Sequence, residues 1–189
     1  MLQEEKLTLS IIYKAKDNTV EYFICKFLEN DSITISSEIG IKKDSFAHSN
    51  LSSIKITSAL TKIEKSAFEN CNELLNFVCG EMGQDKNTGN IKGINIAESD
   101  IDFTVQKDAF KNCLKLETVI LPQCKNLVIE KEAFSGCESL RTVVALCDEI
   151  DFTENPFADC PDYLTFVCRK NSKIDRFARE NDYRNVYVE

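Results

Sequence analysis

A pentapeptide recurs along the chain at regular intervals, and it is the feature that most restricts the fold. It has the form Ala-Phe-x-x-Cys, with proline in place of alanine in the last copy and an early copy that lacks the cysteine. The steps between successive phenylalanines are 22, 42, 24 and 23 residues, a period of about 23 with one long gap. A unit of this length cannot bury its apolar side alone, so the copies are predicted to stack into a solenoid. The repeated phenylalanines are Phe46, Phe68, Phe110, Phe134 and Phe157.

A second element, an apolar-x-x-apolar-x-apolar run, begins three residues after each cysteine position in most copies. Its last three residues alternate between inward and outward positions, which is the period of a short β-strand. A further apolar residue precedes most of the phenylalanines by five positions. The pattern therefore predicts a right-handed solenoid with one parallel strand in each repeat. The runs begin at Leu51, Leu74, Leu116, Leu140 and Tyr163.

Together these elements follow a pattern close to I-x-x-x-A-F-x-x-C-x-x-L-x-x-V-x-L, which resembles the BspA-like leucine-rich repeats, also called the LRR_5 type. The resemblance covers residues 41–168 in five copies. It implies an α/β repeat fold, a leucine-rich-repeat solenoid with one short parallel strand per repeat of about 23 residues, capped at both ends. It also implies a curved, non-enzymatic recognition domain, often a bacterial or protozoan surface protein that binds host or matrix proteins. It carries over no catalytic residues.

The phenylalanine and cysteine of each pentapeptide are predicted to point inward from a short turn or helix on the convex side. Each would contact the same residue type one coil away, so that the rings form an aromatic spine. Cysteine in this setting is a small buried hydrophobe with a weak S–H donor, which favours reduced thiols over disulfides between adjacent rungs. The predicted core residues of the repeat are Phe68, Cys71, Phe110, Cys113, Phe134, Cys137, Phe157 and Cys160.

The chain has nine cysteines, an odd number that cannot all pair within one molecule. None has the close spacing of a zinc knuckle or of a C-x-x-C motif, so neither a metal site nor a thioredoxin-like site is expected. Cys79 and Cys168 close strand runs at inward positions. Cys25, Cys124 and Cys147 lie outside the repeat frame, so a reactive thiol or a disulfide is expected among these three.

The two ends of the chain depart from the repeat. Residues 1–40 are predicted to form a β-rich N-terminal cap, with strand-prone runs at 8–15 and 20–27 joined as a hairpin and a further strand at 32–36. Residues 169–189 are predicted to form a C-terminal cap. There, apolar residues at helical spacing follow an Asn-Ser pair suited to an N-cap, and a last strand ends the chain.

The long gap, at about 80–104, contains four of the six glycines. Either a degenerate repeat or a protruding hairpin would fit it. Insertions between repeats commonly emerge on one face and carry function, so this segment is a second candidate contact surface. Glu98, Asp100 and Asp102 alternate within it, which favours a solvated acidic face over a calcium site, because calcium ligands usually converge from a loop.

The residues between the inward positions of the strand runs are predicted to face a concave binding surface. The central column is apolar over four consecutive members, which is typical of a hydrophobic contact stripe. The alternative remains that β-branched residues are favoured in strands on either face. The predicted partner-binding residues are the column Lys55, Val78, Ile120, Val144 and Val167 with its polar neighbours Asn76, Thr118, Thr142 and Thr165.

Composition narrows the possible partners. With 23 basic against 31 acidic residues, a net charge of −8 and a pI near 4.9, the chain lacks the basic surface that nucleic acid requires. Its apolar runs are far shorter than the ~20 residues that cross a bilayer, so no membrane insertion is expected. One histidine, His48, expected in an exposed turn, and six glycines offer little for catalysis or a phosphate loop. No cofactor and no metal are predicted.

Three functional hypotheses follow. The first is a protein-recognition module, a surface protein or adhesin by family resemblance. The second is an intracellular scaffold, favoured by reduced thiols and by an N-terminus without a leader. A carbohydrate-binding module ranks lower, because there is no tryptophan and most phenylalanines are assigned to the core. We expect a monomer with an unidentified protein partner. The cell surface follows from the resemblance, and the cytoplasm follows if this N-terminus is that of the full-length chain.

Overall fold

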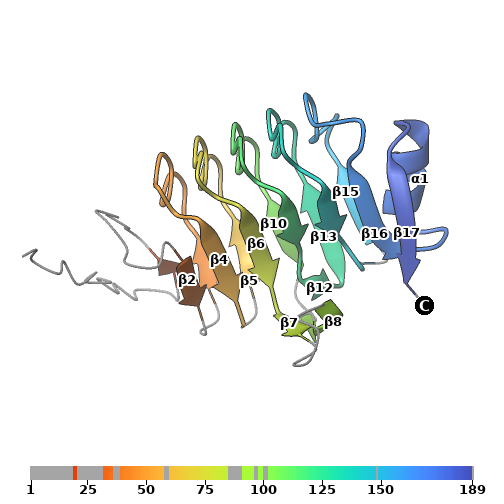
Figure 1. Ribbon diagram of the computed structural model, residues 1–189, viewed down its shortest axis with the longest axis horizontal. Coiled ribbons are helices and arrows are strands. Elements are labelled where there is room, and N and C mark those ends of the chain that lie inside the picture. Colours follow the sequence, from red (N-terminus) through yellow and green to blue (C-terminus); the bar gives the residue numbers. More distant parts are fainter. Residues whose placement is uncertain are drawn as a thin grey trace, which may run out of the picture.

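The structure is a computed structural model that describes residues 19–20, 32–35, 39–57, 60–84, 91–95, 98–99, 102–147 and 149–188. The chain winds into a solenoid whose coils lie side by side (Figure 1). The coils contribute strands to two parallel sheets, one of six strands and one of seven, and the last coil contributes a strand to the larger sheet alone. The predicted leucine-rich-repeat solenoid is confirmed, and each coil but the last carries a second strand beyond the one that the sequence pattern predicted.

The seven-stranded sheet contains the strands predicted from the apolar runs. Its inward residues, such as Ile54, Val119 and Val143, are fully buried, whereas the residues between them face away from the core. In spatial order the strands are β17 (Arg184–Val188), β16 (Thr165–Arg169), β14 (Thr142–Val144), β11 (Thr118–Ile120), β6 (Asn76–Cys79), β4 (Ser53–Ile56) and β2 (Ser32–Ile35).

The six-stranded sheet lies across the core from the first. The single apolar residue expected before each pentapeptide lies in one of its strands and is buried, as Ile63, Val105 and Ile129 show. In order the strands are β1 (Thr19–Val20), β3 (Ile39–Ile41), β5 (Leu60–Ile63), β10 (Phe103–Val105), β13 (Asn126–Ile129) and β15 (Glu149–Phe152).

The pentapeptides form the tight turns at the upper edge of Figure 1, which lead from the six-stranded to the seven-stranded sheet. Their phenylalanine rings stack from Phe46 to Phe157 with centroid separations of 4.9, 4.9, 5.0 and 5.0 Å and with planes 4–6° apart. All five rings are buried. They form a continuous aromatic spine through the described coils.

Backbone hydrogen bonds continue between coils through these turns. The N–H of Phe110 donates to the carbonyl of Ala133 at 2.7 Å, and that of Phe68 donates to Ala109 at 2.7 Å. Each turn contains two residues of positive φ, as at Asp108 and Asn112 on either side of Phe110. Asparagine and aspartate tolerate this conformation better than other side chains, which accounts for their frequency around the phenylalanine.

The long gap between the second and third pentapeptides forms a hairpin, one of the two alternatives that the sequence left open. Strands β7 (Glu81–Gln84) and β8 (Ile91–Asn95) pair antiparallel, below the solenoid and away from the phenylalanine turns (Figure 1). The short strands β9 (Glu98–Ser99) and β12 (Gln123–Cys124) then pair in parallel. Asp102 is exposed, and its Oδ1 accepts a hydrogen bond from Asn126 Nδ2 at 2.6 Å. Asp100 lies outside the described residues, and the acidic-face interpretation remains a prediction.

At the N-terminal end, β1 and β2 pair in parallel with β3 and β4 and so extend both sheets. The strand predicted at 32–36 is present as β2. The predicted hairpin runs at 8–15 and 20–27 lie outside the described residues, apart from residue 20 in β1. The division into two caps and a repeat region remains a prediction.

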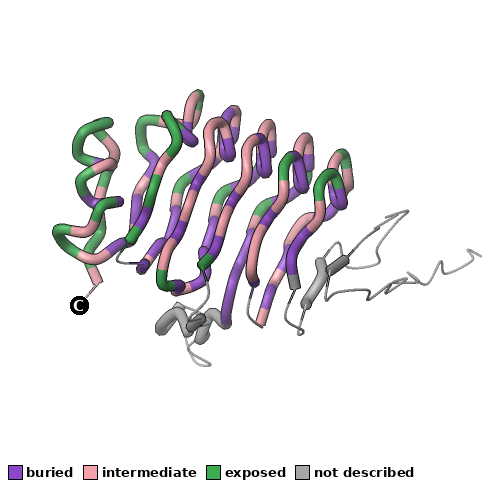
Figure 2. Tube along the Cα trace, turned by 180° about the vertical axis from the view of Figure 1, so that it is seen from behind, coloured by how far each residue is buried: buried purple, intermediate pink, exposed green. Residues whose placement is uncertain are grey.

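At the C-terminal end, helix α1 (Lys173–Glu180) begins after Ser172, whose Oγ accepts a hydrogen bond from the N–H of Asp175. Phe177 of α1 stacks on Phe152 at 4.3 Å and contacts Tyr183, so the helix covers the end of the core. Figure 2 shows the resulting distribution, with buried residues along the strands and exposed ones gathered at the turn tips and at this end.

Candidate functional site

The residues predicted to bind a partner lie on the outer face of the seven-stranded sheet, in two ladders set by the strand register. The apolar ladder aligns Lys55 with Val78, Ile120, Val144 and Val167 in successive strands. The polar ladder runs beside it. Its members in register are Ser53, Asn76, Thr118, Thr142, Thr165 and, on β17, Arg184.

The middle of the apolar ladder is closed to solvent. Val78, Ile120 and Val144 keep 4, 1 and 2% exposure and form a hydrophobic cluster of their own, separate from the main core. Leu146 and Val167, both partly buried, pack against this cluster. Strand alternation predicted correctly that these side chains point away from the solenoid interior, but it does not show what covers them. An open hydrophobic stripe is therefore absent at these three positions.

The polar ladder remains at the surface. Asn76, Thr118, Thr142 and Thr165 are half-buried, so each offers part of its side chain to solvent. The Thr165 hydroxyl donates to the carbonyl of Tyr163 at 3.3 Å. The residue directly before each member of the ladder is more exposed in three coils, and these residues form a second row beside it. They are Leu75, Glu117 and Arg141.

The last repeat exchanges the roles of two neighbouring residues. The repeat pattern assigns Tyr163 to the buried position that Leu74, Leu116 and Leu140 occupy in other coils. Tyr163 is instead 43% exposed, and Leu164 is buried in its place. Arg141 lies over the Tyr163 ring, 5.6 Å from its centroid, in a cation–π contact.

Pro161 distinguishes the last coil at the start of this exchange. After the cysteine in two other coils, the N–H of Asn72 or Glu138 donates to a carbonyl two residues earlier. Pro161 occupies that place in the last coil and has no N–H to donate. In three other coils the buried leucine donates its N–H to the carbonyl of the cysteine. In the last coil this bond is displaced by one residue, and the N–H of Leu164 donates to the carbonyl of Pro161 at 3.0 Å.

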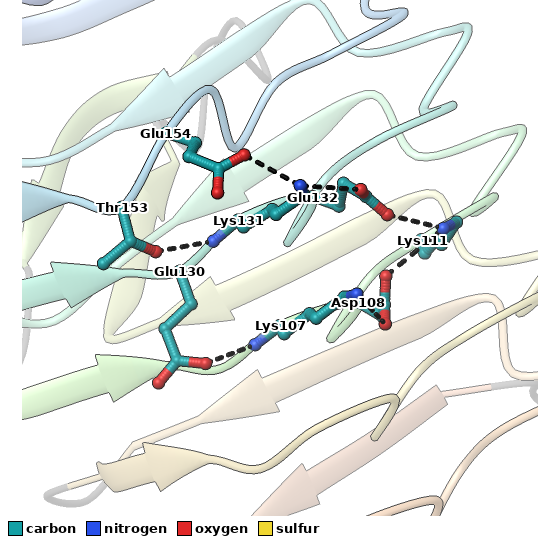
Figure 3. Close-up of polar contacts among 8 residues, drawn as sticks. All are labelled: Lys107, Asp108, Lys111, Glu130, Lys131, Glu132, Thr153 and Glu154. Atoms are coloured by element: carbon teal, nitrogen blue, oxygen red, sulfur yellow. Dashed lines mark hydrogen bonds and ion pairs between the residues drawn. The ribbon is translucent and has the colours of Figure 1, made fainter.

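A network of charged side chains lies where the strands of the six-stranded sheet lead into the phenylalanine turns (Figure 3). Lys111 Nζ lies 2.8 Å from Glu132 Oε2 and 3.3 Å from Asp108 Oδ1, and Lys131 Nζ lies 2.8 Å from Glu154 Oε2. The hydrogen bond to Glu132 raises the pKa of Lys111, and the same contact lowers the pKa of Glu132. The basic and acidic groups of this network therefore neutralise one another across adjacent coils.

The same edge contains a ladder of hydrogen bonds between side chains and backbone. The residue after each strand accepts from a backbone N–H of the preceding coil, which satisfies a donor that the strand ladder leaves free. Glutamate, glutamine and threonine all fill this position. The bonds join the N–H groups of Lys43, Lys65, Lys107 and Lys131 to the side chains of Glu64, Gln106, Glu130 and Thr153 at 3.1, 3.0, 2.9 and 2.8 Å.

The repeated cysteines form a ladder of free thiols. Each thiol donates a hydrogen bond to the carbonyl of the phenylalanine one coil earlier, so the cysteine both fills space and satisfies a turn carbonyl. Burial raises the pKa of the Cys160 thiol to about 12, which keeps it protonated at neutral pH. The donors Cys71, Cys113, Cys137 and Cys160 bond to Phe46, Phe68, Phe110 and Phe134 at 2.8, 3.0, 3.1 and 3.2 Å.

Candidate metal sites and membrane-spanning helices are absent from the described ranges. These ranges contain no group of three or more His, Cys, Asp or Glu side chains placed to hold a metal ion. His48 lies exposed in its turn. None of the helices in the part of the chain that the structure describes has the length and apolar character needed to cross a membrane.

Comparison with protein families identifies the chain. The model of the BspA type leucine-rich repeat region matches it in six copies, over residues 9–75, 23–104 and 86–182. The chain therefore belongs to the BspA-type leucine-rich repeat family. The matched residues extend beyond 41–168 at both ends, into the segments predicted as caps.

No curated protein and no solved structure matches the chain. Repeats of this family indicate a protein-interaction module. A solenoid of this family is typically a non-enzymatic repeat scaffold.

Proposed function

We propose that the chain is a protein-recognition module, of the surface-protein or adhesin type that binds host or matrix protein. We place its contact surface on the outer face of the seven-stranded sheet. The observation that carries this proposal is the polar ladder of Asn76, Thr118, Thr142 and Thr165, which is half-buried, in register and unbroken across four coils.

The adjoining row supplies the contacts that a protein partner needs. Leu75 and Tyr163 are 38 and 43% exposed, and tyrosine is one of the residues that most often act as anchors in interfaces. Glu117 and Arg141 lie between them and bring one charge of each sign. Neighbouring parallel strands are about 4.8 Å apart, so the surface is a strip that suits an extended partner segment.

The buried cluster of Val78, Ile120 and Val144 supports this surface from beneath rather than contacting the partner. Side chains packed at 1–4% exposure hold the strands in register. Lys55 and Val167, half-buried at the two ends of the column, remain available at the margin of the strip.

One observation favours an intracellular scaffold as the second candidate. The eight cysteines that the structure describes are all free thiols, and thiols persist in reducing compartments. Protein purified from its native source without reductant should then give nine reactive thiols per chain on unfolding. Loss of thiols among the repeated cysteines would favour an oxidising compartment and hence the surface protein.

The recognition surface is tested by capture with the immobilised chain from cell extracts and from purified matrix proteins. The test variant is Thr118→Arg with Thr142→Arg, which places two large charges on the polar ladder without touching the core. The matched control is Thr104→Arg with Val128→Arg, in register on the outer face of the six-stranded sheet and also half-buried.

We expect the wild type and the control to capture the same partner and the test variant to lose it, with all three proteins unfolding at similar temperatures. If the test variant still captures the partner, the proposed contact surface is contradicted. Loss in the control alone would place recognition on the six-stranded sheet.

A further inference from the structure

Two cysteines outside the repeat ladder face each other across adjacent coils. The sulfur atoms of Cys124 and Cys147 lie 2.9 Å apart. The two residues are 23 positions apart, which is one period of the repeat. Both lie where the chain crosses from the seven-stranded to the six-stranded sheet, Cys124 in β12 and Cys147 between β14 and β15.

The surroundings of this pair differ from those of the repeated cysteines. The repeated thiols point to phenylalanine carbonyls, whereas the closest contact of Cys124 Sγ is the Cys147 sulfur, with the carbonyl of Asn126 at 3.5 Å. Cys147 Sγ also accepts from the N–H of Cys124 at 3.2 Å and lies 3.3 Å from the carbonyl of Pro122. These bonds hold the two sulfurs toward each other, at 2.9 Å, which is shorter than a sulfur–sulfur van der Waals contact but longer than the ~2.05 Å bond of a disulfide.

We propose that Cys124 and Cys147 are a disulfide-forming pair, at which a peroxide links two consecutive coils covalently. Cys124 is the more accessible sulfur, at 7% exposure against 1% for Cys147, and a small peroxide is the oxidant that fits this opening. Cys124 attacks one oxygen of hydrogen peroxide and becomes a sulfenic acid as the first water leaves. Cys147 then attacks the Cys124 sulfur, and the hydroxyl leaves with the Cys147 proton as a second water. Two thiols are oxidised and one peroxide is reduced.

The disulfide would join two coils at the edge where the chain crosses from the seven-stranded to the six-stranded sheet. The stacked phenylalanines lie at the other edge, where the chain crosses back. Leu146, next to Cys147, packs against the buried cluster of Val78, Ile120 and Val144. A covalent tie at Cys147 therefore fixes the chain beside the sheet proposed to bind a partner. The hydrogen bond with Cys147, together with burial, raises the pKa of Cys124, so oxidation is slow at neutral pH and faster as the pH rises.

Peptide mapping of the wild-type chain tests the pair directly. The folded protein is treated with hydrogen peroxide, its remaining thiols are alkylated, and it is digested without reductant by trypsin and an endoprotease that cleaves before aspartate. Trypsin releases residues 116–125 with Cys124, and cleavage before Asp148 isolates residues 142–147 with Cys147 from Cys160 and Cys168. We expect these two peptides to be joined, with the intact chain lighter by about 2 Da.

The expected physical effect is a rise in the unfolding temperature of roughly 5–10 °C on oxidation, because a link across one repeat restricts the unfolded chain. Dithiothreitol should reverse the rise, and Cys147→Ser should abolish it. Cys71→Ser is the matched control and should retain it, since the chain itself has Ser49 hydrogen-bonded at the corresponding place, 3.4 Å from Cys71 Sγ.

The proposal would be overturned if both peptides are recovered unlinked, each with its cysteine alkylated. This outcome counts where the same peroxide treatment oxidises the unfolded chain. A link that maps to repeated cysteines would also overturn it. The mapping uses only the wild type, so it decides the question even where a serine variant fails to fold.

Discussion

At the scale of single residues, the stability of the solenoid depends on the phenylalanine of each turn. Phe134 is stacked on both sides, 5.0 Å from Phe110 and 5.0 Å from Phe157, and is fully buried. Phe134→Ala should lower the free energy of unfolding by about 3–5 kcal/mol, because it leaves a cavity in the centre of the spine. Chemical denaturation measures the change.

The control for this prediction is Val128→Ala, a half-buried residue on the outer face of the six-stranded sheet. It should cost less than about 1 kcal/mol, because its surroundings are solvated. Equal losses in Phe134→Ala and Val128→Ala would show that the spine is not a principal source of stability.

At the scale of elements, the C-terminal helix is held by one buried carboxylate, Asp175. Its oxygens accept hydrogen bonds from the N–H of Asn171 at 2.8 Å, from Asn185 Nδ2 at 2.9 Å and from the Tyr187 hydroxyl at 3.1 Å. Arg179 lies 3.1 Å from the same carboxylate. Burial alone would raise the pKa of Asp175, but these bonds and Arg179 outweigh it, and the pKa lies below its ordinary value of 3.8.

This lowered pKa sets the direction of a pH dependence. The carboxylate stabilises the folded chain fully above pH 3.8, and that contribution disappears as the pH falls through the lower, folded-state pKa. Asp175→Asn should therefore lower the unfolding temperature at pH 7, with a loss of about 1–3 kcal/mol, and the difference from the wild type should shrink in acid.

The exposed Asp182→Asn, in a turn of positive φ that asparagine tolerates, is the control for Asp175→Asn and should change neither value. A difference between Asp175→Asn and the wild type that stays constant down to pH 2 would contradict the assigned role of the carboxylate.

Sequence reasoning predicted the five middle strands of the seven-stranded sheet because three alternating positions mark each of them. It missed the six-stranded sheet, since each of those strands had contributed only one recognised apolar position, such as Val105 in β10 or Ile129 in β13. It also misplaced Tyr163, because the repeat frame does not take account of Pro161, which follows Cys160 and has no N–H to donate.

At the scale of the whole molecule, the repeat period predicts the stacking of coils, but it does not predict which outward faces stay open. Val78, Ile120 and Val144 point outward as expected and are nevertheless buried. Burial depends on contacts between coils, such as those that join Val78, Ile120 and Val144 from three neighbouring strands, and no local pattern identifies them. The polar ladder, by contrast, follows from register alone, and its role in binding stays a prediction.

A scan of partner affinity along the polar ladder decides whether the seven-stranded sheet is the recognition surface. Asn76, Thr118, Thr142 and Thr165 are each replaced singly by arginine, and the dissociation constant for the captured partner is compared with that of Thr104→Arg on the opposite sheet. The account predicts losses of about tenfold or more at adjacent members of the ladder, where a large charge enters a desolvated contact, and no change at Thr104. Unchanged affinity along the whole ladder, or a loss at Thr104 alone, would contradict recognition through the seven-stranded sheet.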